Sequence, residues 1–84
     1  MTKLEQKLKE LGYEYECLNI YYKEFNKTLV LTIDLYPNLI YGRVHCCFAE
    51  FHNQQDIDNL QLAFNEMQRD LEVLKEYENN TREE

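Results

Sequence analysis

Apolar residues near the N-terminus recur at helical spacing. Three leucines set this period: Leu4, Leu8 and Leu11. Thr2 and Glu5 are placed to form a capping box, in which each side chain bonds an otherwise unpaired backbone N–H of the first turn. Gly12 can adopt the left-handed conformation that ends a helix. The pattern therefore predicts an amphipathic helix over Thr2–Leu11.

The period then changes to the two-residue alternation of β-strands. In Tyr13–Lys23 this alternation changes phase near Cys17 and Leu18. A β-bulge at that point is one interpretation. The other is a continuous strand with Leu18 and Ile20 on the inner face, and we favour it because it leaves the tyrosines together on one face.

Two further strands are predicted, Thr28–Tyr36 and Leu39–Phe51, with the turn residues Pro37 and Asn38 between them. One face of the first carries only apolar residues: Leu29, Leu31, Ile33 and Leu35. Gly42 falls on the inner face of the second and can let that strand bend. Strands joined by such short turns are typical of an antiparallel meander.

The longest helical pattern runs from Gln54 to Tyr77. Asn53 is the expected N-cap, with Asp56 at the third helical position. Its apolar residues follow alternating spacings of three and four: Ile57, Leu60, Phe64, Met67, Leu71 and Leu74. This stripe covers the sheet or, alternatively, forms the seam of a homodimer, because six apolar positions exceed what a small sheet needs.

The order of elements predicts an α+β fold, α-β-β-β-α, with a three-stranded antiparallel meander and two helices packed on one face. A chain of 84 residues supports one domain, which we place at residues 1–78, followed by a polar, frayed tail at 79–84. The N-terminal stretch has neither a secretory nor a transmembrane pattern, so we expect a cytoplasmic protein without a membrane partner.

Negative charge is concentrated in the second half of the chain. Residues 1–49 contain six acidic and six basic side chains, whereas residues 50–84 contain ten acidic and three basic ones. The whole net charge of −7 therefore lies in the second part. Such a surface repels phosphates and attracts basic proteins. We expect a protein partner with a basic surface and no direct binding of nucleic acid.

The segment Arg43–His52, RVHCCFAEFH, brings two cysteines and two histidines together. Neighbouring residues of a strand point to opposite faces, so Cys46 and Cys47 cannot bind one metal ion together. Cys46 is expected to be buried, whereas His45 and Cys47 share the outer face. Because no catalytic or cofactor motif accompanies them, we expect no metal, no cofactor and no enzymatic activity.

Two groups of side chains are candidates for partner contacts. The acidic group lies along the long helix: Asp56, Asp58, Glu66, Asp70, Glu72 and Glu76. The aromatic group is Tyr36 and Tyr41 on the open face of the sheet, and we place Tyr13, Tyr15 and Tyr21 beside them. Tyrosine is enriched at the centres of protein interfaces, although cross-strand pairing and a solvated helix face would produce the same patterns.

The predicted α-β-β-β-α order is similar to that of double-stranded RNA-binding domains. Those domains place a lysine cluster at the start of their second helix to hold phosphates. Here the corresponding stretch, Asn53–Asn59, reads NQQDIDN and is acidic. We therefore reject RNA binding.

The chain also resembles the small acidic proteins of Gram-positive bacteriophages and prophages. The likeness rests on its length, its element order, the opening MTKLEQKLKELGY and the acidic second half. Among those proteins are anti-CRISPR inhibitors, some of which act as DNA mimics. The resemblance implies a non-enzymatic inhibitor that occupies a basic nucleic-acid-binding groove of a host protein. The alternative is a homodimeric structural or assembly protein that associates through its C-terminal helix.

Overall fold

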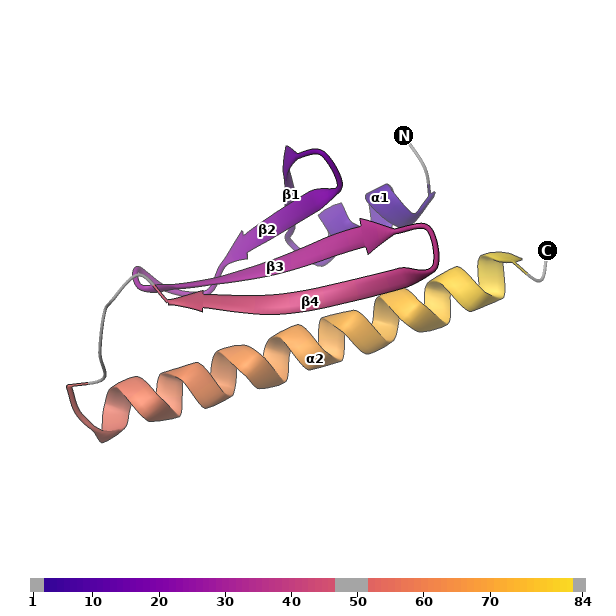
Figure 1. Ribbon diagram of the computed structural model, residues 1–84. Coiled ribbons are helices and arrows are strands. Elements are labelled where there is room, and N and C mark those ends of the chain that lie inside the picture. The colour runs from indigo at the N-terminus through magenta and orange to yellow at the C-terminus, as the bar shows by residue number, and fades with distance from the viewer. Residues whose placement is uncertain (1–2, 47–51, 83–84) are drawn as a thin grey trace.

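The computed structural model describes residues 3–46 and 52–82, and the side chains within these ranges as far as residue 78. It is an α+β fold in which two helices accompany one antiparallel sheet (Figure 1). The elements are α1 (Lys3–Glu10), β1 (Glu14–Cys17), β2 (Ile20–Glu24), β3 (Leu29–Tyr36), β4 (Leu39–Cys46) and α2 (Gln54–Arg82). The predicted class is confirmed, but the described chain forms four strands where the sequence predicted three.

The additional strand comes from the segment predicted to be one strand, Tyr13–Lys23. Its change of phase marks a hairpin turn between β1 and β2, so the favoured interpretation of one continuous strand was wrong. The β1–β2 register also shifts between Tyr15 and Cys17, an irregularity close to the position of the alternative, a β-bulge. Leu18 forms the turn with a φ of 50°, a left-handed conformation that a leucine rarely adopts, and its side chain is exposed. Asn19 attaches the turn to β3, because its side-chain amide donates to the Leu35 carbonyl oxygen at 2.7 Å.

The C-terminus of α1 ends as the sequence predicts. Gly12 has a φ of 99°, and its N–H donates to the Lys9 carbonyl oxygen at 3.0 Å. The Tyr13 N–H donates to the Leu8 carbonyl oxygen at 2.9 Å, which completes a Schellman motif. Leu8 and Tyr13 are both buried in the core, so this turn also directs the chain into the sheet. Thr2, the proposed cap at the other end, lies outside the described residues.

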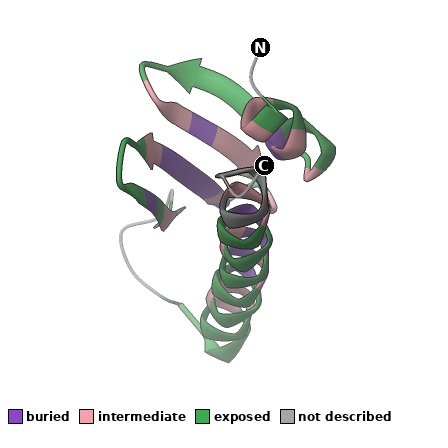
Figure 2. Ribbon diagram, turned by 90° about the vertical axis from the view of Figure 1, so that its right-hand side faces the viewer, coloured by how far each residue is buried: buried purple, intermediate pink, exposed green. Residues whose placement is uncertain are grey.

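The sheet has the order β1-β2-β3-β4, and both helices lie on one side of it (Figure 2). The inner face of β3 carries Leu29, Leu31 and Ile33, all of which are buried. They pack against Leu8 of α1 and against α2 residues that include Met67. The alternation read from the sequence of β3 therefore assigns its faces correctly.

Helix α2 begins at Gln54, as predicted, because Asn53 caps it. The Asn53 Oδ1 accepts a hydrogen bond from the Asp56 N–H at 3.0 Å. The helix continues to Arg82, beyond the predicted end at Tyr77, so residues 79–82 are helical where a frayed tail was expected. Its 29 residues contain neither glycine nor proline, the two residues that most strongly interrupt a helix.

The apolar stripe of α2 is only partly buried, which corrects the prediction. Leu60, Met67 and Leu74 do face the sheet. Ile57 and Phe64, however, are 46% and 43% exposed. Positions 63 and 70, occupied by alanine and aspartate, are buried instead. A sheet whose longest strands have eight residues covers a narrow strip of a 29-residue helix, and α2 is rotated so that this strip excludes two of the predicted core residues.

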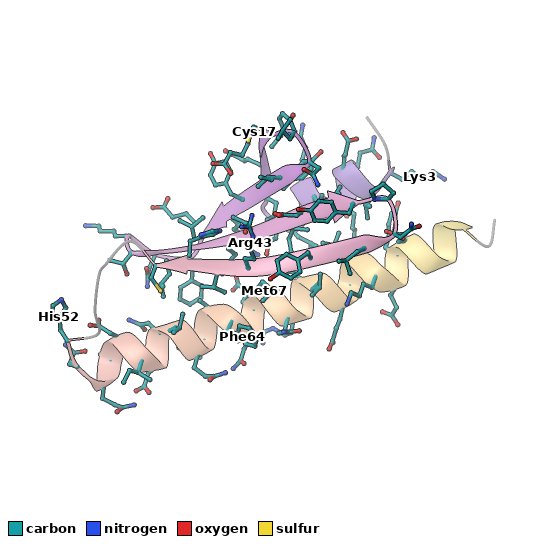
Figure 3. All side chains as sticks on the ribbon, viewed as in Figure 1. Lys3, Cys17, Arg43, His52, Phe64 and Met67 are labelled. Atoms are coloured by element: carbon teal, nitrogen blue, oxygen red, sulfur yellow. The ribbon has the colours of Figure 1, made fainter. Side chains whose placement is uncertain are left out.

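Gly42 of β4 provides room for the helix. It lies on the inner face, as predicted, and pairs with Ile33. Met67 of α2 lies between the helix and β4 (Figure 3). A Cβ atom built on Gly42 would collide with the Met67 sulfur. The glycine therefore allows close approach of α2 to β4.

We expect Gly42→Ala to lower the free energy of unfolding by about 1–3 kcal/mol, because the added methyl group must displace the buried Met67 side chain. Urea denaturation would measure this loss. Met67→Ala should make the additional cost of Gly42→Ala smaller, so the two substitutions should be less than additive. Strict additivity would contradict the proposed steric role.

Candidate functional site

One face of the sheet is not covered by either described helix, and we call it the helix-free face. Its central side chains come from alternate positions of three strands: Ile20, Tyr22, Val30, Thr32, Asp34, Tyr36, Leu39, Tyr41, Arg43 and His45. Tyr36 and Tyr41 are 49% and 48% exposed, in agreement with their predicted location. The face is a candidate binding site because it combines exposed aromatic residues with a hollow.

An ion pair between a buried carboxylate and a partly exposed arginine underlies this face. Asp34 is only 3% exposed. The Nη2 atom of Arg43 donates to both of its carboxylate oxygens, at 3.2 and 2.9 Å, and the Tyr36 hydroxyl donates to one of them at 3.5 Å. A buried carboxylate requires such compensation. The pair therefore connects β3 to β4 and helps to orient Tyr36.

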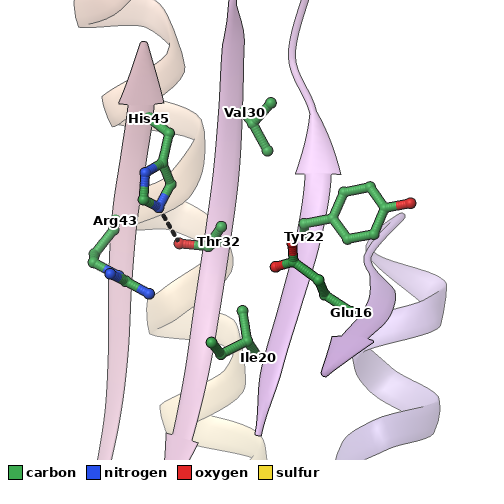
Figure 4. A pocket seen from close by; sticks show the side chains of 7 residues that line it. All are labelled: Glu16, Ile20, Tyr22, Val30, Thr32, Arg43 and His45. Carbon is green, nitrogen blue, oxygen red and sulfur yellow. Dashed lines mark hydrogen bonds between the residues drawn. The ribbon is translucent and has the colours of Figure 1, made fainter. Parts of the chain in front are cut away.

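The hollow has a volume of about 310 Å³ and is open to solvent (Figure 4). It is lined by Glu16, Ile20, Tyr22, Val30, Thr32, Arg43 and His45. The Thr32 hydroxyl and the His45 Nε2 are 3.3 Å apart, and the Arg43 Nε is buried without a hydrogen-bond partner. Polar and apolar groups thus occur together, which suits a side chain of a protein partner.

Sequence reasoning did not assign Arg43 and His45 to a binding site. The information was nevertheless present, because a two-residue turn at Pro37 and Asn38 places Arg43 opposite Thr32 and diagonally across from Asp34. What alternation could not indicate was that the side chains around this pair leave a hollow. That property depends on the volumes of residues from three strands.

Three exposed side chains form an apolar group at one end of the helix-free face, and we call this group the tyrosine cluster. It consists of Tyr36, Leu39 and Tyr41, at the end of the sheet where β3 turns into β4. Tyr36 and Leu39 are directly opposite each other, and Leu39 is also exposed. These three residues lie on regular strands, which hold them in defined positions.

Three other tyrosines predicted on this face lie elsewhere. Tyr13 and Tyr21 are buried in the core beneath the opposite face. Tyr15 is opposite Tyr21, and their rings meet edge-on with centroids 5.4 Å apart. The error follows from the missed hairpin, because the turn at Leu18 reverses the chain and breaks the assumed alternation.

The predicted acidic group does not form one surface. Asp58, Glu72 and Glu76 are exposed on α2. Asp56 acts at the helix start, where its carboxylate accepts the His52 N–H at 2.9 Å. The remaining two, Glu66 and Asp70, turn toward the sheet and bind a lysine from β2. The acidic residues that remain exposed lie on the side of α2 away from the sheet, opposite the tyrosine cluster.

Lys23 of β2 binds the two inward carboxylates. Its Nζ lies 2.7 Å from the Asp70 Oδ2 and 3.2 Å from the Glu66 Oε2, and it donates to the Leu11 carbonyl oxygen at 3.0 Å. The Tyr13 hydroxyl donates to the same Asp70 oxygen at 2.9 Å. Asp70 is 8% exposed, so it is part of the interior and not of the predicted contact surface.

We expect Lys23→Met to lower the free energy of unfolding by about 3 kcal/mol, because it leaves a largely buried Asp70 carboxylate without its cation. Chemical denaturation at neutral pH would measure the change. Lys9→Met, an exposed position on α1, is the matched control and should cost less than about 0.5 kcal/mol. Equal effects of the two substitutions would contradict the importance of this ion pair.

The Tyr13 hydroxyl should make the protein sensitive to alkali. Burial, and secondly the Asp70 carboxylate, raise the pKa of Tyr13 well above its usual value of 10.0. Above that pH the unfolded chain loses this proton while the folded chain keeps it, so stability should fall by up to about 1.4 kcal/mol per pH unit.

Urea denaturation between about pH 8 and pH 11.5 would measure this fall, and Tyr13→Phe should have a shallower slope because it removes one titrating group. Tyr21 should retain part of the slope, since burial also raises its pKa. Identical slopes in the two proteins would show that Tyr13 does not contribute.

The cysteines do not assemble into a site in the described structure. Cys46 pairs with the inward residue Leu29, but it is exposed at the end of β4, where the sequence predicted a buried thiol. Cys17 is exposed in the β1–β2 hairpin, and Cys47 lies outside the described residues. Within residues 3–46 and 52–82, no three histidine, cysteine, aspartate or glutamate side chains come together as a metal ion would require.

Comparisons with known proteins do not assign the chain to a family. No family model matches it, and no significant match was found among curated proteins or solved structures. The resemblance to phage inhibitors therefore stays a prediction. Neither helix in the described part of the chain combines the length and apolar character needed to cross a membrane.

Proposed function

We propose that this chain is a small protein-binding module that acts through its helix-free face. The observation that supports this most directly is the tyrosine cluster, three exposed apolar side chains grouped on a sheet face that no described helix covers. Exposed apolar groups of this kind mark interaction surfaces more often than isolated ones do. The adjoining hollow adds hydrogen-bonding groups beside the cluster.

Tyrosine is well suited to the centre of such an interface. Its ring buries a large apolar area, and its hydroxyl retains a hydrogen bond when water is excluded. Tyr36 already donates its hydroxyl to Asp34, so part of its orientation is established before a partner binds. Such preorganisation reduces the entropy lost on binding.

The negative charge supports a basic partner, but in a different way from the one first predicted. The exposed carboxylates of Asp58, Glu72 and Glu76 lie across the molecule from the tyrosine cluster, so one flat partner surface cannot contact both. A net charge of −7 still attracts a basic protein over a distance and accelerates encounter. We therefore propose that the tyrosines make the contacts and the carboxylates provide steering.

A basic nucleic-acid-binding groove on a host protein has the appropriate charge, and this is the partner that the phage resemblance implies. Blocking such a groove requires only binding, without chemistry at the face. The chain would therefore inhibit its partner by occupying that groove. The partner would lose access to nucleic acid while the tyrosine cluster is bound.

The proposal can be tested with purified protein as bait in an extract of its native host. We expect Tyr36→Ser with Tyr41→Ser to weaken capture of the partner at least tenfold, because both anchoring rings are lost. Titration calorimetry with the identified partner would measure the affinity. For the unmodified chain, the affinity should also decrease between about 0.05 M and 0.5 M salt, as expected for a charge-steered encounter.

Two further variants distinguish the two surfaces. Glu72→Gln with Glu76→Gln should reduce the association rate and its salt dependence, with little change in the dissociation rate. Leu62→Ser removes an exposed apolar residue of α2 and should have no effect. If the glutamate variant abolished capture and the tyrosine variant did not, binding would have to be reassigned to the helix.

A further inference from the structure

One side of α2 leaves its apolar residues partly uncovered, and we call it the α2 flank. It consists of Ile57, Gln61, Phe64, Gln68, Leu71 and Lys75. At about 100° per residue, these six positions fall within roughly 80° of the helix circumference. Ile57 and Phe64 are largely exposed, whereas Leu71 packs partly against the core. The flank therefore continues the buried stripe toward solvent.

The position of the α2 flank follows from the Lys23 contacts. Glu66 and Asp70 lie on the other side of the buried stripe, where they bind Lys23 of β2. The flank must therefore lie on the opposite side, toward β4 and away from α1. Strand β4 pairs with β3 alone among the described strands, so it ends the sheet there. An unpaired strand edge and a partly uncovered apolar flank thus adjoin each other.

The two features are also level with each other. Met67 lies directly over Gly42, near the middle of β4. Phe64, Gln68 and Leu71 lie next to Met67 on one side of the helix, so the middle of the α2 flank lies beside the middle of the strand. The eight residues of β4 extend about 27 Å, and the rise from Ile57 to Lys75 is also about 27 Å. They form one surface of matched length.

The charge of this surface is unlike that of the remaining helix. Residues 50–84 contain ten acidic side chains, yet none is among the six flank positions, and Lys75 is the only charged one. Among the lysine, arginine, aspartate and glutamate residues of the chain, only Arg43 lies in β4, and β4 contains no proline. Long edge strands that do not pair with another chain usually carry several charged residues or a proline, which prevent such pairing.

We propose that a second copy of this chain binds here, with its β4 antiparallel to the first β4 and its α2 flank against the first flank. A two-fold axis through the middle of β4 would make the contact self-complementary. It would bring Phe64 of each copy close to Leu71 of the other, because they lie about one turn before and one turn after Met67 on the helix. Two chains of net charge −7 can approach on this side because the flank carries no carboxylate.

The size of the surface determines how strong the dimer should be. About 27 Å of length and about 15 Å of width give a footprint of roughly 400 Å², below the ~800 Å² per partner of a standard interface. We therefore expect a dimer in reversible equilibrium, with a dissociation constant in the micromolar range. The extended sheet would present two helix-free faces on the same side, so each dimer would bind two partner sites.

Sedimentation velocity between about 1 and 300 µM tests the proposal. The unmodified chain should change from monomer to dimer over this range. Phe64→Glu should raise the dissociation constant at least tenfold, because it places a carboxylate in the flank. Leu62→Glu is the matched control: Leu62 is 55% exposed on a different side of the same helix, and its replacement should leave the equilibrium unchanged. Leu71 is less suitable because it also packs against the core.

Hydrogen exchange separates strand pairing from helix contact alone. Amides within residues 39–46 should gain protection when the unmodified chain dimerises, and Phe64→Glu should abolish this gain. A chain that remains monomeric at 300 µM would overturn the proposal. So would equal effects of Phe64→Glu and Leu62→Glu, or a dimer in which β4 gains no protection.

Discussion

The contacts of Lys23 determine how α2 lies on the sheet. The Lys23 ammonium group binds the carboxylates at positions 66 and 70 of α2 and the Leu11 carbonyl oxygen just after α1, while Tyr13 donates to the same Asp70 oxygen. Charged groups that are removed from water must be paired closely, so this network permits little rotation of the helix. Its rotation in turn decides which residues of α2 enter the core and which remain on the surface.

That rotation gives the two sides of α2 different surroundings. Alanine at position 63 and aspartate at position 70 are buried, while Phe64 and Ile57 are exposed. Carboxylates that face away from the sheet remain available for long-range attraction. The aromatic contacts lie on the other layer, where the sheet is uncovered. A small chain thereby offers three different surfaces, to which we assign contact, steering and self-association as proposals.

Leu18 and α2 are the two places where the structure departs most from the sequence predictions. Alternation in β3 and β4 predicted the faces of Tyr36, Tyr41 and Gly42 correctly, because both strands are regular and joined by a turn with a recognisable composition. The β1–β2 turn contains neither glycine nor proline, so its phase change was mistaken for a feature of one strand. In α2, the heptad-like spacing of apolar residues predicted the stripe. It could not predict how the Lys23 contacts would rotate that stripe relative to the sheet.

The sequence alone determined the capped start of α2, the Schellman motif at the end of α1, the alternation of β3 and β4, and the net charge. Each of these depends on neighbouring residues or on composition. Only the tertiary structure decided that Asp70 is buried and Phe64 exposed, and that the tyrosine cluster and the outer carboxylates lie on opposite sides. These outcomes depend on contacts between residues about 50 positions apart, such as Lys23 with Asp70. Periodicity describes which residues of one element share a face, but the energy of burying a charge beside its partner chooses the face that turns inward.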